Sequence, residues 1–167
     1  MTLVELNASD RDRFVATIGW VFEHSPWVAE RVWERRPFSS VEELHAAMVA
    51  EVSAARPEEQ MALLRAHPDL GARARISDAS TGEQAGAGLD RLTPGEFERL
   101  QQLNSAYRAR FGFPFLFAVR GSTKHDVLGT LAERLSASPA DERVEALRQV
   151  SRIAWFRLQD AISSPAS

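Results

Sequence analysis

The stretch TPGEFERLQQLNSAYRARFG, residues 93–112, carries both the start and the stop signals of a long amphipathic helix. Thr93 and Glu96 have the spacing of a capping box, in which each side chain accepts a hydrogen bond from the backbone N–H of the other residue, and Pro94 suits the first helical position. Gly112 stands where such a helix is expected to stop. Apolar residues recur between these signals at helical spacing, at Phe97, Leu100, Leu103, Tyr107 and Phe111. The stretch therefore predicts a long helix with one buried face.

Similar signals along the chain predict seven further helices and decide the fold class. A serine followed three residues later by a glutamate, at Ser40 and Glu43 and again at Ser80 and Glu83, predicts two more capping boxes, and Ser9 is expected to cap the first helix. The expected helices cover about residues 9–21, 25–35, 40–52, 57–67, 80–89, 122–135 and 138–158. We therefore expect an all-α fold, a single compact domain of about eight helices over residues 1–167 with a short frayed tail from about residue 163.

One stretch has the composition of a β-strand and not of a helix. FPFLFAV, residues 113–119, is short, apolar and aromatic. The sequence has no second run of this kind to pair with it, and a lone strand is not stable. We expect a buried extended segment between two helices.

The composition is that of a soluble globular protein. With 167 residues, 44% of them hydrophobic and 26% charged, the chain is long enough for one sizeable core, and its net charge of -3 gives no reason to expect a nucleic-acid partner. No apolar run approaches the ~20 residues of a membrane-spanning helix, and no basic and then apolar leader opens the chain, so we expect a cytoplasmic location and no membrane partner. The absence of cysteine excludes thiol nucleophiles and disulfides and fits a reducing compartment.

The stretch LLRAHPDLG, residues 63–71, places a histidine directly before a proline. A residue before proline is disfavoured in the α region, so the preceding helix is expected to end at His67. Pro68 fixes the direction of the chain after it, and Gly71 frees the backbone shortly beyond. Imidazole is the commonest general acid or base near neutral pH, but an imidazole at the end of a helix also offsets the helix dipole. The residues alone leave both roles of His67 open.

Three polar side chains are further candidates for a functional site. Glu83 is either a cap partner or a functional carboxylate, and Gln84 beside it offers both donors and acceptors to a planar polar ligand. Arg120 ends the apolar run and either binds an anion or caps a helix. The four histidines are scattered and no H-E-x-x-H motif occurs, so we expect no metal site.

Together these stretches resemble one family closely, the 2-oxo-4-hydroxy-4-carboxy-5-ureidoimidazoline (OHCU) decarboxylases of urate degradation. The resemblance runs, in this order, through FVATIGWVFEHSPWVAERVWERRPFSSVEELHAAM, LLRAHPDLG, SDASTGEQAGAGLD and LNSAYRARFGFPFLFAVRG. It covers nearly the whole chain and is far more specific than any one motif. It implies an all-helical carboxy-lyase that needs no metal or organic cofactor and converts OHCU to (S)-allantoin and CO2.

The resemblance also implies roles for individual residues. The histidine of the family's H-P-x-L motif, here His67 with Pro68 beside it, is the catalytic residue, and we expect it to act as a general acid or base. Glu83 is expected to orient the imidazole or to hold ureido N–H groups. The remaining expected substrate contacts come from the S-x-x-E-Q motif, from the segment after F-G-F-P and from the arginine that follows it: Ser80, Glu83, Gln84, Phe115, Leu116, Phe117, Ala118, Val119 and Arg120.

Several alternatives stay open beside this interpretation. A salt bridge from Arg120 to the leaving carboxylate would stabilise the substrate more than the transition state, so we expect Arg120 to hold an oxygen that gains charge, or to be structural. A helical binding module without catalysis would keep the fold, and a lyase for a related ureido acid would keep the site. The implied partners are the small-molecule substrate and, by function, urate oxidase and hydroxyisourate hydrolase. A homodimer is one option, because the aromatic-rich helices supply either an interface or core.

Overall fold

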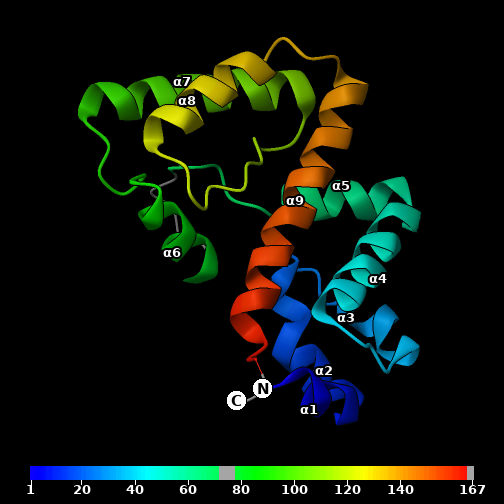
Figure 1. Cartoon of the computed structure of the whole chain (residues 1–167). Helices are drawn as coiled ribbons and strands as arrows, with labels where there is room; N and C mark the ends of the chain where they lie inside the picture. Colours follow the sequence, from blue (N-terminus) through cyan, green and yellow to red (C-terminus); the bar gives the residue numbers. More distant parts are fainter. Residues whose placement is uncertain (72–77, 165–167) are drawn as a thin grey trace. The chain divides into compact units, whose positions relative to one another are not determined.

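The computed structural model describes residues 1–71 and 78–164 (Figure 1). Within these ranges it has nine α-helices, the short 3₁₀ helices Gly19–Val21 and Trp33–Arg35, and no strand beyond an isolated β-bridge between Thr2 and Ser163. The prediction of an all-α fold is confirmed. The helices are α1 (Leu3–Ala8), α2 (Arg11–Ile18), α3 (Trp27–Val32), α4 (Val41–Ala54), α5 (Pro57–Arg65), α6 (Asp78–Gly86), α7 (Pro94–Phe111), α8 (Lys124–Arg134) and α9 (Pro139–Ala161).

The contacts of the chain divide it into two compact units. One unit comprises Met1–Ala66 and Val150–Ser167, and the other comprises His67–Gln149. The last helix, α9, therefore contributes its first half to the second unit and its second half to the first. The single domain over residues 1–167 stays a prediction.

The unit formed by the two ends of the chain has a core of aliphatic and aromatic side chains. In it α3 packs against α2 and α4. The predicted apolar stripe of α4 is confirmed, since this helix buries Leu44, Met48 and Val52. Full burial of one such side chain contributes about 1.5–3 kcal/mol to folding. The fully buried members of this core include Leu6, Phe14, Ile18, Val28, Val32, Leu44, Met48, Leu63, Leu64, Ala154 and Leu158.

The start of the chain differs from the prediction. Ser9 follows the last residue of α1 and donates its hydroxyl to the Glu5 carbonyl, whereas Asp10 caps α2 and accepts from the Arg13 N–H at 2.8 Å. The short helix α1 begins at a capping box formed by Thr2 and Glu5. Because α1 buries only Leu6, it has no apolar stripe that a periodicity argument could detect. This helix accounts for nine helices in the described residues in place of the expected eight.

In the unit His67–Gln149 the predicted long helix is confirmed. The capping box of Thr93 and Glu96 is present, and Gly112 ends α7 in the left-handed conformation with φ 80°. α7 packs against α8, which Figure 1 shows running beside it. The start of α8 is one residue later than expected, because Thr123 and not Ser122 is the N-cap and accepts from the Asp126 N–H. The segment 113–119 has no regular secondary structure and is mostly buried, as predicted.

The predicted capping box of Ser80 and Glu83 is wrong. α6 begins at Asp78, so Ser80 lies inside its first turn and not at the N-cap, and the helix ends at Gly86, before Leu89. A serine and a glutamate three residues apart also occur within helices, where they share one face. The S-x-x-E pattern therefore located this helix but not its first residue.

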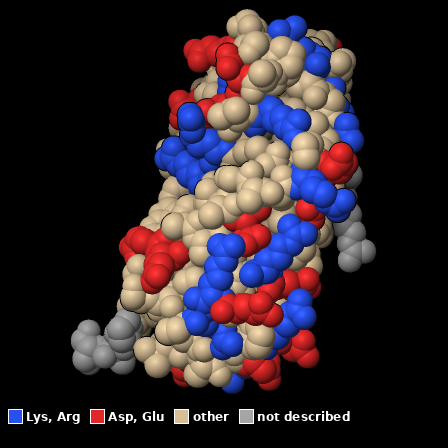
Figure 2. All heavy atoms as spheres, turned by 90° about the vertical axis from the view of Figure 1, so that its right-hand side faces the viewer, with Lys and Arg blue, Asp and Glu red and all other residues tan. Residues whose placement is uncertain are grey.

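The surface mixes both signs of charge. Figure 2 shows Lys and Arg interspersed with Asp and Glu on the face that it presents. In the unit formed by the chain ends, Arg31 pairs with Glu59 and Arg35 pairs with Glu51. Exposed pairs of this kind contribute roughly 0–1 kcal/mol each. Among the described helices, none is long and apolar enough to cross a membrane.

Candidate active site

All the site residues expected from the sequence lie in the unit His67–Gln149. They come from three places in it: the turn after α5, helix α6, and the segment that links α7 to α8. His67, Ser80 and Gln84 are each less than 10% exposed, whereas Glu83 and Pro68 are half-buried and Arg120 is exposed. One polypeptide unit therefore holds every candidate.

His67 lies just beyond the end of α5. The helix ends at Arg65, and the N–H of Ala66 donates to the Ala62 carbonyl at 2.9 Å. The helix end predicted from the His-Pro dipeptide is thus confirmed to within two residues. His67 is only 6% exposed, which is unusual for a polar side chain at a helix end.

Gln84 connects α6 to the loop that follows His67. Its side-chain Oε1 accepts a hydrogen bond from the N–H of Gly71 at 2.8 Å. Gly71 has φ 73°, a left-handed conformation that glycine adopts without strain. Because Oε1 is occupied, the two donors on Nε2 remain, and Nε2 has no hydrogen-bond partner among the described residues. The unbonded hydrogens of Nε2 are therefore the groups that the side chain offers first to a ligand.

The segment Phe115 to Val119 is held by two side chains that no sequence pattern indicates. Arg134 on α8 donates from Nη1 to the carbonyl of Leu116 at 2.6 Å, and Gln149 on α9 accepts from the N–H of Ala118 at 2.9 Å. Within the described chain, no hydrogen bond joins this segment to His67 or to α6. The structure therefore ties the segment to α8 and α9, and ties the His67 loop to α6.

Several backbone amides of this segment have no hydrogen-bond partner among residues 1–71 and 78–164. Ala118 and Val119 are each 5% exposed and Leu116 is 3% exposed, so the segment is largely removed from water. The N–H groups of Leu116, Phe117 and Val119 make no hydrogen bond to any other described residue. Buried backbone donors are nearly always paired, so unpaired ones are well suited to bind an oxygen atom of a ligand.

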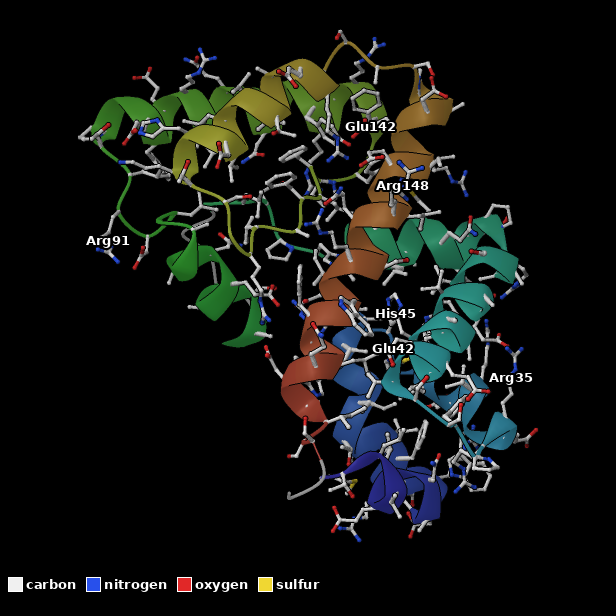
Figure 3. All side chains as sticks on the ribbon, in the orientation of Figure 1. Arg35, Glu42, His45, Arg91, Glu142 and Arg148 are labelled. Carbon is white, nitrogen blue, oxygen red and sulfur yellow. The ribbon has the colours of Figure 1, made fainter. Side chains whose placement is uncertain are left out.

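A buried ionic network supports the segment from behind. Arg134 donates from Nε to Oε1 of Glu142 at 2.7 Å, and the same carboxylate accepts the hydroxyl of Tyr107. The guanidinium carbon of Arg134 also lies 4.6 Å from the centroid of the Phe115 ring. Figure 3 shows Glu142 on the first turn of α9.

The network changes the acidity of its tyrosine. Burial, and next the hydrogen bond to Glu142, raise the pKa of Tyr107 far above its ordinary value. Tyr107 therefore stays a neutral donor. The helical periodicity places Tyr107 on the apolar face of α7 but does not indicate its partner. Glu142 gives no local sign of this role, because acidic residues are common in the first turn of a helix, where they interact favourably with the helix dipole.

A surface hollow of about 430 Å³ lies elsewhere in this unit. It is lined by Ala85, Gly86, Ala87, Gly88, Arg91, Ser122, Thr123, Lys124 and His125. None of the predicted site residues lines it, and its Lys124 is paired with Glu96 at 2.6 Å. In the described parts of the chain, no group of three or more His, Asp or Glu side chains has an arrangement that could hold a metal ion.

Comparisons with known proteins show which family the chain resembles. A family model for OHCU decarboxylase matches residues 7–159. The chain is 47% identical to the 2-oxo-4-hydroxy-4-carboxy-5-ureidoimidazoline decarboxylase of Haloferax volcanii, with 98% of each chain covered. It is also 44% identical to the uric acid degradation bifunctional protein PucL of Bacillus subtilis, over 97% of this chain and 33% of that protein.

A solved structure is also similar to nearly the whole of this chain. The crystal structure of (S)-allantoin synthase superposes with a TM-score of 0.81 at 36% identity, over 97% of this chain. This chain spans about half, 54%, of that solved chain. Similarity of this extent and identity exceeds what a shared helical fold alone would give. The chain belongs to the OHCU decarboxylase family.

Proposed function

We propose that this protein is a carboxy-lyase that converts OHCU to (S)-allantoin and CO2 during urate degradation. The observation that carries the proposal is the agreement with the family over residues 7–159, which includes the buried His67 and the helix that bears Gln84. The close relative from Haloferax volcanii, which covers 98% of this chain, bears the name of this activity.

The reaction requires no electron sink from the protein. The bond between the hydroxyl-bearing ring carbon and the carboxylate breaks, CO2 leaves, and the electron pair forms a double bond to the neighbouring ureido-bearing carbon, whose C=N electron pair moves onto the ring nitrogen and takes up a proton. The hydroxyl of the resulting enol then loses its proton and becomes the carbonyl of allantoin, while a proton delivered to one face of the ureido-bearing carbon gives a single enantiomer. The protein has to orient the carboxylate out of the ring plane, stabilise the oxygen that gains charge and place the proton donor.

His67 is the residue proposed to handle the proton, with Glu83 orienting its imidazole or holding the ureido N–H groups. The burial of His67 supports this role, because a buried imidazole can transfer a proton without exchange with bulk water. Glu83 lies on α6, one residue before Gln84.

The other proposed contacts bind the substrate. Gln84 donates to a carbonyl or carboxylate oxygen, and Ser80 and Pro68 line the pocket beside it. The segment Phe115, Leu116, Phe117, Ala118 and Val119 supplies apolar walls and the unpaired backbone N–H groups described above. Arg120 holds an oxygen that gains charge or has a structural role, and its exposed position favours the structural role.

The proposal includes a place in the pathway. Urate oxidase and hydroxyisourate hydrolase supply the substrate, which the bifunctional relative named for uric acid degradation supports. A cysteine-free chain fits the cytoplasm, which cell fractionation tests. Light scattering of the purified protein distinguishes a monomer from a homodimer.

Circular dichroism during turnover tests the activity. OHCU is generated in place from urate by urate oxidase and hydroxyisourate hydrolase, and the wild type is compared with His67→Asn. We expect rapid appearance of the (S)-allantoin signal with the wild type, and a rate close to that of the spontaneous racemic decay with the variant. Spontaneous decay with the wild type would refute the proposal in favour of a binding module. Turnover of another ureido acid in preference to OHCU would reassign the substrate.

A further inference from the structure

The peptide group between Leu70 and Gly71 is held at both ends by side chains from two helices. Its carbonyl accepts a hydrogen bond from Nδ2 of Asn104 on α7 at 2.9 Å, and its N–H donates to Oε1 of Gln84 on α6 at 2.8 Å. In a trans peptide the C=O and the N–H point in opposite directions. Asn104 and Gln84 therefore hold this peptide from opposite sides.

One face of α7 contacts three consecutive residues of the loop after His67. Arg108 pairs with Asp69 at 3.2 Å, Asn104 bonds to Leu70, and the side chain of Leu100 occupies the space that a Cβ on Gly71 would need. Positions four residues apart lie on the same face of a helix, so these three contacts follow α7 in the reverse order of the loop. The loop cannot slide along α7 without breaking all three.

We propose that Asn104 is a positioning residue of the active site, which acts through the Leu70–Gly71 peptide to hold the Gln84 amide with its Nε2 donors toward the substrate. This inference rests on the proposed function. Asn104 is 7% exposed, and its Oδ1 has no hydrogen-bond partner among the described residues, so its contribution through hydrogen bonds comes from the single bond to Leu70. Hydrogen bonds in a chain polarise one another, so the bond at the carbonyl strengthens the donor at the N–H of the same peptide.

The hydrogen bonds of the Gln84 amide determine which part of the substrate it faces. Oε1 already accepts from Gly71, whereas neither hydrogen of Nε2 is bonded to a described residue, so the favoured partner of the amide is an oxygen of the substrate rather than a ureido N–H. Without the bond from Asn104 the carbonyl end of the peptide is no longer fixed, and the bond at its N–H, which distinguishes the oxygen of the Gln84 amide from its nitrogen, is weakened. The substrate oxygen then faces an amide whose orientation is less well defined.

A double-mutant cycle on kcat and KM tests this coupling. Wild type, Asn104→Leu, Gln84→Ala and the double variant are compared with OHCU generated in place, and helicity is checked for each. We expect a loss of about tenfold in kcat/KM for Asn104→Leu and no further loss when it is added to Gln84→Ala, because the two residues act as one unit. Arg108→Gln, on the same face of α7 but at an exposed ion pair, is the matched control and is expected to change kcat/KM by less than about twofold. Losses that multiply in the double variant would overturn the proposal.

Amide hydrogen exchange provides a readout that does not depend on activity. The Gly71 amide is expected to be protected in the wild type and to lose protection in both Asn104→Leu and Gln84→Ala, but not in Arg108→Gln. Unchanged protection of Gly71 in Asn104→Leu would overturn the proposal even if the variant is less stable. Asn104→Ala serves where Asn104→Leu does not fold. If the wild type does not turn over OHCU, the proposed function fails, whereas the exchange experiment still decides whether Asn104 holds the peptide.

Discussion

Nη1 of Arg134 lies 2.6 Å from the carbonyl oxygen of Leu116, and the rest of the same guanidinium is paired with the carboxylate of Glu142. One side chain thus joins helix α8, the start of α9 and the extended segment between α7 and α8. Glu142 is almost completely buried, so its charge depends on Arg134 for compensation.

Replacing Arg134 by methionine is expected to destabilise the protein by about 3–5 kcal/mol, because it leaves the buried Glu142 carboxylate without its cation. Urea unfolding at pH 7 measures the change. Arg148→Met is the matched control, since Arg148, on α9, also pairs with a glutamate, Glu145, but its side chain is 70% exposed (Figure 3). The control is expected to change the unfolding free energy by less than about 0.5–1 kcal/mol. Equal changes in the unfolding free energy for the two substitutions would show that burial of the Arg134–Glu142 pair does not determine its contribution to stability.

Tyr107 is the only tyrosine of the chain, so tyrosinate absorbance reports on it alone. Its pKa is raised by burial and by the hydrogen bond to Glu142, so the native protein is expected to show no tyrosinate at pH values where the urea-unfolded chain, which titrates near pH ~10, is already ionised. Because the pKa of Tyr107 is higher in the folded than in the unfolded protein, its contribution to folding stability is fully present below the unfolded pKa. This contribution is lost as the pH rises from the unfolded pKa toward the folded pKa. Native titration near pH ~10 would contradict the buried network.

Glu96 is expected to stabilise α7 in a pH-dependent way. The hydrogen bond from Lys124 and next that from the Thr93 N–H lower its pKa from 4.5 to about 2. A lowered folded pKa means that the stabilisation is present above the unfolded value of 4.5 and is lost as the pH falls toward 2.

Urea unfolding at pH 7 and at low pH tests this dependence. Glu96→Gln is expected to be less stable than the wild type at pH 7 and equal to it near pH 2. Glu98→Gln makes the same change of charge on the exposed side of the same helix and is expected to differ little from the wild type at either pH. A pH-independent effect of Glu96→Gln would exclude the ionised carboxylate as its cause.

Alanine at Gly71 is expected to be more harmful than alanine at Gly88. Both residues have positive φ, 73° and 79°, which costs an L-residue about 1–2 kcal/mol. At Gly71 the new Cβ would also overlap Leu100, whereas at Gly88 it meets no atom within 4 Å. Thermal unfolding of the two variants separates the cost of the overlap from the cost of the backbone conformation. Equal losses of stability would mean that Leu100 moves aside freely.

Local signals in the sequence were sufficient to predict the positions of most of the helices. Thr93, Glu96 and Gly112 mark both ends of α7, because caps act through residues no more than four positions apart. The same logic failed at Ser9, where the adjacent residue takes the cap position, and at Ser80, which lies inside α6. Asp10, one residue after Ser9, is the cap of α2.

The supports of the candidate site could not be predicted in this way. Arg134 and Leu116 are 18 residues apart, and Asn104 and Leu70 are 34 apart. Neither pair has a spacing that belongs to a helix or a turn, and each contact forms only once the helices have packed. The resemblance to a family supplied the expected roles of His67, Glu83 and Gln84, but not the residues that hold them in place.

The two ends of the described chain meet. Thr2 and Ser163 form a β-bridge, and the N–H of Ser163 donates to the carbonyl of Met1 at 2.9 Å. A short peptide linker could therefore join them without distorting either end, and new termini opened in an exposed connection should leave the fold intact. For the same reason, a fold of this kind can be carried inside a longer polypeptide, with a second protein module attached at one side of its surface.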